Sequence, residues 1–182
     1  MTKLIADKDE EERRLKALAE YRILGTEPES CYDDITQIAA RTCHVPISLM
    51  TLVDKDRQWF KSKVGFQTNE TRRDWSFCTH AIKENHPLIV NDACIDERFI
   101  NNPLVIGDPK IRFYAGFPLK NSDGNKLGTL CVIDRKPGSL DAEQCSIMEL
   151  LARQIVSFLE LRKRSLNLLD ALSHLHHQEG IL

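Results

Sequence analysis

A cysteine and a histidine stand two residues apart in DWSFCTH (74–80), which makes this stretch the best suited to chemistry. A thiol at a helix N-terminus can have a lowered pKa, and a nearby imidazole can act as a base or as a ligand. Cys78 and His80 are therefore candidates for ligand contact or for thiol chemistry. In the alternative interpretation both pack structurally, and Ser76 or Asp74 caps the helix.

Arg112 and Tyr114 are two residues apart in a segment of strand composition, so we expect their side chains on one face of a sheet. If that face lines a pocket, Arg112 could hold a carboxylate or phosphate and Tyr114 could form an aromatic wall. Phe77 and Asp92 complete the predicted ligand-binding set. Alternatively, Arg112 pairs with Asp92 or another acidic residue to pin a loop, and Phe77 is a core aromatic.

The cysteines and histidines predict no metal site. The six cysteines contain no C-x-x-C pair, so neither a disulfide framework nor a zinc knuckle is indicated. His174 and His177 are spaced i, i+3, but no third ligand with suitable spacing accompanies them. The sequence names no cofactor.

The composition is that of an ordinary globular protein. The 182 residues carry a net charge of −2 and are 42% hydrophobic, which fits one domain with a terminal extension. Such a charge argues against a nucleic-acid or anionic-membrane partner. The chain contains no signal peptide and no apolar run of bilayer length, so we expect a cytoplasmic protein.

Hydrophobic periodicity predicts a helix over 8–24 and a second helix from Tyr32 to Thr42. Two segments rich in apolar and β-branched residues, 47–54 and 57–65, predict a β-hairpin around a polar turn. The polar segment 68–75 is expected to be a loop.

The second half of the chain predicts a short helix over 78–85, a strand over 88–92 and an irregular, lid-like segment over 93–110. Asp123-Gly124 separates two segments of strand composition, which indicates a second hairpin. A helical pattern then runs from Asp141 for some thirty residues. Strands arranged as hairpins favour a mainly antiparallel sheet, and the fold class is therefore α+β.

Several segments together resemble the GAF family, specifically the N-terminal GAF sensory domains of bacterial sensor histidine kinases and diguanylate cyclases. The resemblance implies a central antiparallel sheet of about six strands with helices on both faces and a ligand pocket beneath short helices. It places the domain at 1–160, with a helical extension at 161–182. The matching segments are 21–40, 47–65, 72–82, 99–105, 111–119 and 126–137.

The resemblance implies a non-catalytic signalling input domain that binds a small molecule and relays the signal through its terminal helices. Two alternatives stay open: a thiol-dependent redox enzyme that uses Cys78, and a ligand-free dimerisation scaffold with a side-chain-filled pocket. A bilin would need a cysteine inside the pocket. Cys43-His44 has the dipeptide of the related chromoproteins, but it lies at the end of the second predicted helix.

The terminal helices are expected to form a homodimer. Four leucines follow one another at spacings of seven, four and three, close to a coiled-coil seam: Leu161, Leu168, Leu172 and Leu175. Packing against the N-terminal helix through Leu15 and Leu18, as a four-helix bundle across two chains, is equally compatible with this pattern. A kinase or cyclase output domain or protein is the expected recipient of the signal.

Overall fold

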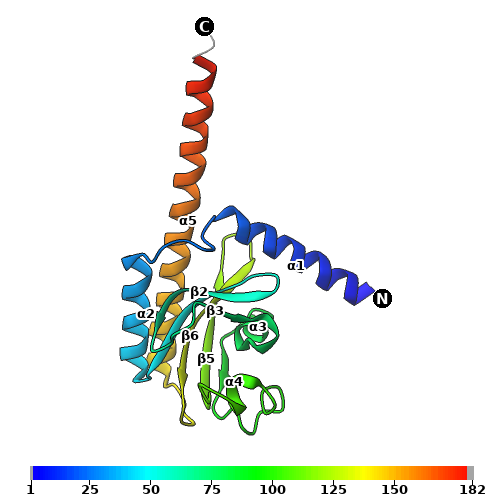
Figure 1. The fold of residues 1–182 in the computed structure, drawn as a ribbon, viewed down its shortest axis with the longest axis vertical. Helices are drawn as coiled ribbons and strands as arrows, with labels where there is room; N and C mark the ends of the chain where they lie inside the picture. Colours follow the sequence, from blue (N-terminus) through cyan, green and yellow to red (C-terminus); the bar gives the residue numbers. More distant parts are fainter. Residues whose placement is uncertain (1, 180–182) are drawn as a thin grey trace.

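The structure is a computed structural model and describes residues 2–179 (Figure 1). Within this range six strands form one sheet in the order β3-β2-β1-β6-β5-β4, and every neighbouring pair is antiparallel. This arrangement confirms the predicted α+β class. The strands are β1 (Ile47–Val53), β2 (Arg57–Val64), β3 (Glu70–Arg72), β4 (Leu88–Val90), β5 (Phe113–Lys120) and β6 (Lys126–Asp134).

Helices cover both faces of the sheet (Figure 1). One face packs against α1, α2 and α5, whereas the other lies under α3 and α4. Each face therefore has its own apolar core. The helices are α1 (Thr2–Glu20), α2 (Ser30–Cys43), α3 (Phe77–Ala81), α4 (Pro103–Ile106) and α5 (Ala142–Glu179), with a 3-10 turn, η1, at Arg73–Trp75.

The two predicted hairpins are both present. In the second, Gly124 has a φ of 87°, and the side-chain oxygen of Asn121 accepts hydrogen bonds from the backbone N–H groups of Asp123 and Asn125. Gly128 lies where β6 crosses close to β1. A Cβ atom at this position would stand 1.9 Å from the carbonyl oxygen of Thr51, so only glycine fits there.

Several predicted boundaries were wrong, among them the end of the strand expected over 88–92, which stops at Val90. The first helix ends at Glu20 rather than at 24, because the chain turns at Arg22 (φ 45°) and directs the next residues into the core. The expected loop 68–75 contains β3 and η1, since an edge strand of polar residues carries little hydrophobic signal. The helix expected over 78–85 ends at Ala81.

The longest element, α5, has 38 residues and is thus roughly 57 Å long. Its first half packs in the core through Met148, Ala152, Ile155 and Leu159, but none of residues 160–177 is buried. Figure 1 shows this second half extending past the sheet. No helix within the described range combines the length and apolar character needed to cross a membrane.

Candidate ligand site and its links to the terminal helices

The short helix α3 holds the predicted Cys78 and His80 against the sheet. Ser76 is its N-cap, and the Ser76 hydroxyl accepts a hydrogen bond from the backbone N–H of Thr79 at 3.1 Å. The same hydroxyl donates to the side-chain oxygen of Gln58 on β2 at 2.6 Å. The cap is therefore anchored to the sheet, while Asp74 pairs with the exposed Arg72.

Cys78 is buried among hydroxyl groups from the sheet. Its sulfur accepts hydrogen bonds from the Tyr114 hydroxyl at 3.3 Å and from the Thr129 hydroxyl at 3.1 Å. Burial alone would raise the pKa of the thiol, but hydrogen bonds with Cys131, Thr129, Thr51 and Tyr114 outweigh burial and lower that pKa. The site therefore contains a polarised thiol that is only 3% exposed to solvent.

His80 packs against an aromatic ring instead of bonding to this thiol. Its ring packs edge-on against Phe99 with 4.9 Å between ring centroids, and burial lowers the pKa of the imidazole. No hydrogen bond joins His80 to Cys78 in the part of the chain that the structure describes. The two residues thus do not form a thiol and general-base pair in this structure.

The space beneath α3 is almost completely filled. Phe77 stacks on Phe99 at a centroid distance of 4.0 Å and lies 5.0 Å from the ring of Tyr114. The remaining cavity has a volume of about 20 Å³, which suits about one water molecule. A small organic ligand would have to displace side chains. The lining residues include Leu49, Phe60, Phe77, Cys78, Tyr114 and Cys131.

Arg112 and Asp92 do not pair with each other. The Arg112 guanidinium donates to the carbonyl oxygens of Val105 and Ile111, both at 2.9 Å, and Asp92 accepts from the backbone N–H of Cys94 at 3.0 Å. The interpretation of Arg112 as the ion-pair partner of Asp92 was therefore wrong. Carbonyl acceptors satisfy the guanidinium instead, and they fasten α4 to the start of β5.

We expect Arg112→Ala to loosen the 93–110 segment far more than it lowers global stability. Hydrogen bonds from charged donors contribute about 1.5–3 kcal/mol each, which corresponds to a rise of about tenfold or more in local amide exchange. Hydrogen exchange followed by mass spectrometry measures this effect. Glu97→Ala, which removes an exposed side chain of the same segment, is the control; a large melting shift with unchanged exchange would contradict the assignment.

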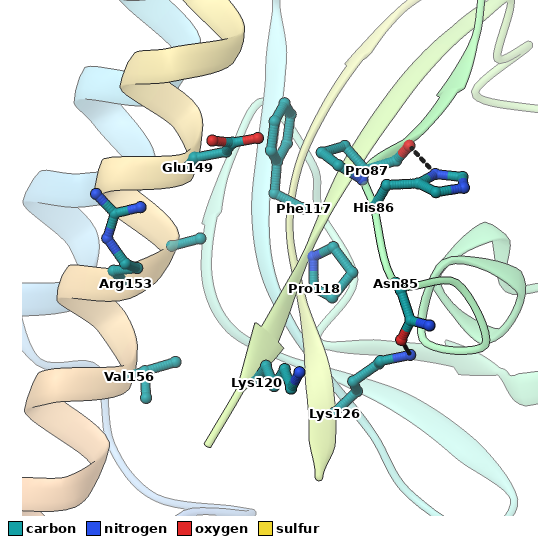
Figure 2. Close-up of a pocket in the computed structure, with 11 residues that line it drawn as sticks. Asn85, His86, Pro87, Phe117, Pro118, Lys120, Lys126, Glu149, Arg153 and Val156 are labelled. Atoms are coloured by element: carbon teal, nitrogen blue, oxygen red, sulfur yellow. Dashed lines mark hydrogen bonds between the residues drawn. The ribbon is translucent and has the colours of Figure 1, made fainter. Parts of the chain in front are cut away.

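A second, larger hollow lies on the opposite side of the sheet, between β5 and the first half of α5 (Figure 2). Its volume is about 310 Å³. Its lining mixes apolar residues of the sheet with charged residues from the strands and the helix. None of the residues predicted from the sequence as ligand contacts lines it.

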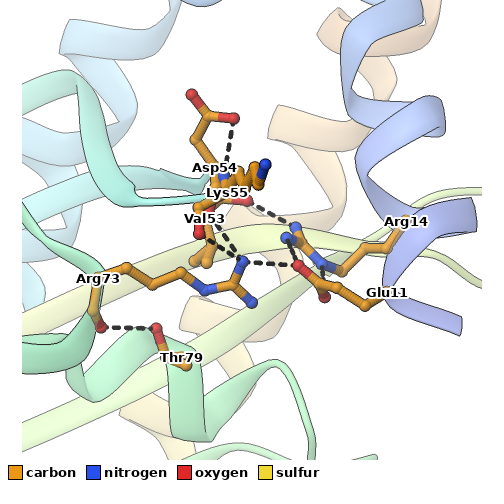
Figure 3. Close-up of polar contacts among 7 residues, drawn as sticks. All are labelled: Glu11, Arg14, Val53, Asp54, Lys55, Arg73 and Thr79. Atoms are coloured by element: carbon orange, nitrogen blue, oxygen red, sulfur yellow. Dashed lines mark hydrogen bonds and ion pairs between the residues drawn. The ribbon is translucent and has the colours of Figure 1, made fainter. Parts of the chain in front are cut away.

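An ionic cluster fastens α1 to the elements that carry α3 (Figure 3). Arg14, only 5% exposed, donates to both carboxylate oxygens of Glu11 and to the carbonyl oxygen of Val53 at 2.7 Å. Arg73 of η1 reaches the same Glu11 carboxylate at 2.6 Å. Burial would raise the pKa of Glu11, but hydrogen bonds from Arg14 and Arg73 lower it to about 2. The Thr79 hydroxyl of α3 donates to the carbonyl oxygen of Arg73 at 3.2 Å.

The other end of α1 is fastened to α5. The Tyr21 hydroxyl donates to the Glu160 carboxylate at 2.6 Å, and Arg162 donates to the carbonyl oxygen of Tyr21 at 2.9 Å. Arg22, just after α1, forms an ion pair with Asp170 on the second half of α5. A continuous set of polar contacts thus connects α3 with α1 and α1 with α5. The sequence reasoning missed it because these partners are far apart in the chain.

The GAF domain family model matches residues 27–158, which cover most of the chain and include the sheet, α3 and α4. The chain belongs to the GAF domain family. The predicted resemblance is thereby confirmed.

The chain is similar to domains of several different proteins. A cyclic di-GMP phosphodiesterase of Pseudomonas aeruginosa is 35% identical over 171 residues, which are 93% of this chain but only 29% of that protein. The GAF domain of an Acinetobacter phosphoenolpyruvate-protein phosphotransferase has a TM-score of 0.59 at 14% identity, covering 85% of this chain and 93% of that one.

A free methionine-R-sulfoxide reductase of Neisseria meningitidis, in complex with its substrate, has a TM-score of 0.61 at 14% identity. The match covers 80% of this chain and 87% of that one. At such identities the structural likeness shows the fold alone. The fold is therefore shared with a methionine sulfoxide reductase as well as with the GAF domain of a phosphotransferase, and the function must be argued from the site.

Proposed function

We propose that this GAF domain is a non-catalytic signalling input domain that passes its signal through the terminal helices. The observation that carries the proposal is the construction of α5. Its first half is part of the core, and its second half presents leucines to solvent, with Leu161 and Leu168 both 62% exposed. One rigid helix therefore connects the sheet to an apolar surface outside the domain. The oligomeric state of variants on that surface is the test.

The leucine stripe is proposed to pair two copies of the chain. At about 100° per residue, Leu161, Leu168, Leu172 and Leu175 lie on one side of α5. Lys163, which pairs with Glu20 at the end of α1, and Asp170, which pairs with Arg22 just after it, lie on the opposite side. The stripe is thus left for a second chain. Leu18 cannot contribute to a bundle across two chains, because it is 2% exposed in its own core.

The contacts between helices support a route for the signal. A shift of α3 would move Arg73 and its carboxylate partner on α1, and α1 in turn is bonded to α5 around Tyr21. Salt bridges and hydrogen bonds between packed elements can exchange one set of partners for another, and a switch requires two such arrangements. We propose that ligand binding beneath α3 changes the position of α5 by this route.

The recipient is proposed to be a kinase, a cyclase or another enzyme of nucleotide signalling. The name of the Pseudomonas relative supports this class, since that protein is described as acting on cyclic di-GMP. Six cysteines without a disulfide support a reducing, cytoplasmic setting.

A thiol-dependent reductase is the rival function, and the Cys78 environment argues against it. The thiol is 3% exposed beside a cavity of about 20 Å³, so a substrate the size of methionine sulfoxide cannot reach the sulfur in this structure.

We therefore expect no reduction of free methionine sulfoxide by the unmodified chain with dithiothreitol, and no change in Cys78→Ala. Product chromatography provides the assay, and Cys43→Ala, in the other core, is the control. Turnover that is lost in Cys78→Ala and kept in Cys43→Ala would establish the enzyme instead.

The filled cavity also favours a second candidate, a scaffold that pairs chains without a ligand beneath α3. Phe77 and Phe99 occupy the volume that a ligand would need. Both candidates use α5 in the same way. They differ in whether anything enters beneath α3.

A further inference from the structure

The hollow between β5 and α5 has the form of a binding pocket. Its volume of about 310 Å³ is at the lower end of the range typical of small-molecule sites. Three elements enclose it: the turn that follows α3, the β5–β6 hairpin and the first half of α5. Its apolar surface comes from Pro87, Phe117, Pro118, Ala152 and Val156.

Cationic side chains surround this apolar surface. Lys120 and Lys126 are directly opposite each other across the β5–β6 hairpin, and like charges at such positions are destabilising. Figure 2 shows the two lysines at one end of the hollow, whereas the Arg153 side chain on α5 is directed along the helix and away from them. Within residues 2–179 none of the three has an ion-pair partner; Lys126 donates a hydrogen bond to the side-chain oxygen of Asn85 at 2.9 Å.

Lys126 lies in the hollow without a carboxylate bonded to it in the described part of the chain. Burial, together with the positive charge of Lys120, lowers the pKa of Lys126, while Glu10 and Glu84 act in the opposite direction without forming an ion pair. Glu149 is the one carboxylate among the described lining residues, and it stands on α5 one turn before Arg153. A bound anion would relieve the repulsion between the lysines.

We propose that this hollow binds a small phosphate monoester carried on a flat ring. The phosphate lies between Lys120 and Lys126, which are opposite each other on the hairpin, and the ring lies against the partly exposed Pro118 and Val156. A phosphate monoester carries close to two negative charges at neutral pH, which suits two cations better than a single carboxylate does. The ring accounts for the apolar surface, which a free phosphate ion would leave uncovered.

This site is separate from the cavity beneath α3 and contacts α5 directly. A ligand there bridges the β5–β6 hairpin to the helix that leaves the domain. Binding can be measured without reference to any output, so the failure of this proposal would leave the signalling proposal untouched.

Titration calorimetry of the full 182-residue chain at pH 7.5 tests the proposal with three probes: phenyl phosphate, inorganic phosphate and phenol. We expect phenyl phosphate to bind at least tenfold more tightly than either of the others, because it alone has both parts. Lys120→Ala and Lys126→Ala should each weaken its binding about tenfold. Lys136→Ala, an exposed lysine outside the hollow, is the control and should leave binding unchanged.

Glu149→Gln supplies a change in the opposite direction, since removal of the carboxylate should tighten phenyl phosphate binding. Circular dichroism verifies that each variant keeps its fold, and all these positions are at the surface of the hollow. Equal affinity for phenyl phosphate and inorganic phosphate would overturn the proposal. So would affinity that is indifferent to Lys120→Ala and Lys126→Ala, or no binding of phenyl phosphate at millimolar concentration.

Discussion

Light scattering at micromolar concentration is expected to report a monomer for the double variant Leu168→Glu, Leu172→Glu and a dimer for the unmodified chain. In a two-stranded seam each substitution occurs twice, so four carboxylates would face an apolar surface. Burying an unpaired charge costs several kcal/mol, and the dimer dissociation constant should rise by roughly a thousandfold or more. Both leucines are exposed in the single chain, at 62% and 46%, so the fold itself should be unaffected.

The matched control is Ser173→Glu, His177→Glu, which adds the same charge to exposed positions on the opposite side of the same helix. This variant should stay dimeric. A double leucine variant that remains a dimer, or a control that dissociates equally, would show that the stripe is not the interface.

Phe77→Ala is expected to destabilise the domain by about 3–5 kcal/mol, the range observed when a buried phenylalanine is truncated to alanine. The side chain is 2% exposed and fills the space beneath α3 through its contacts with Phe99 and Tyr114. Its removal should create an apolar cavity large enough for a ring. Benzene should therefore raise the melting temperature of the variant and leave that of the unmodified chain unchanged.

Phe158→Ala is the control for this experiment. Phe158 is half-buried on the other face, edge-on to Tyr32 at 6.1 Å, so its truncation should cost less and should create no benzene site. If benzene stabilises the unmodified chain as well, the space beneath α3 is open in solution and the scaffold function loses its support.

The fold could be predicted from local patterns because its hairpins are encoded locally. The Asp123-Gly124 turn and the strand-forming residues on both sides of it determine β5 and β6 within about twenty residues. A polar turn between two strand-forming segments likewise determines β1 and β2. The end of α1 could not be predicted. The backbone leaves helical geometry at Arg22, and the Tyr21 side chain bonds to Glu160. That partner is 139 residues away, so the local pattern of hydrophobic residues does not indicate it.

The candidate site was only partly predictable for the same reason. Phe77, Cys78 and Tyr114 do meet beneath α3, as expected for side chains on the covered face of the sheet. Thr129 and Cys131 were missed, although a polar residue inside the strand segment KLGTLCVID was a usable signal. Other groups are assembled only by the tertiary fold, such as the cluster of Glu11 with Arg73 and the hollow between β5 and α5.

The central claim is that the exposed stripe of α5 joins two copies of the chain, and sedimentation equilibrium of the unmodified protein tests it most directly. One chain has a mass of 20.9 kDa. Over a concentration series through the micromolar range, we expect a mass twice that of one chain, with dissociation only on strong dilution. A mass of one chain throughout the series would contradict the claim.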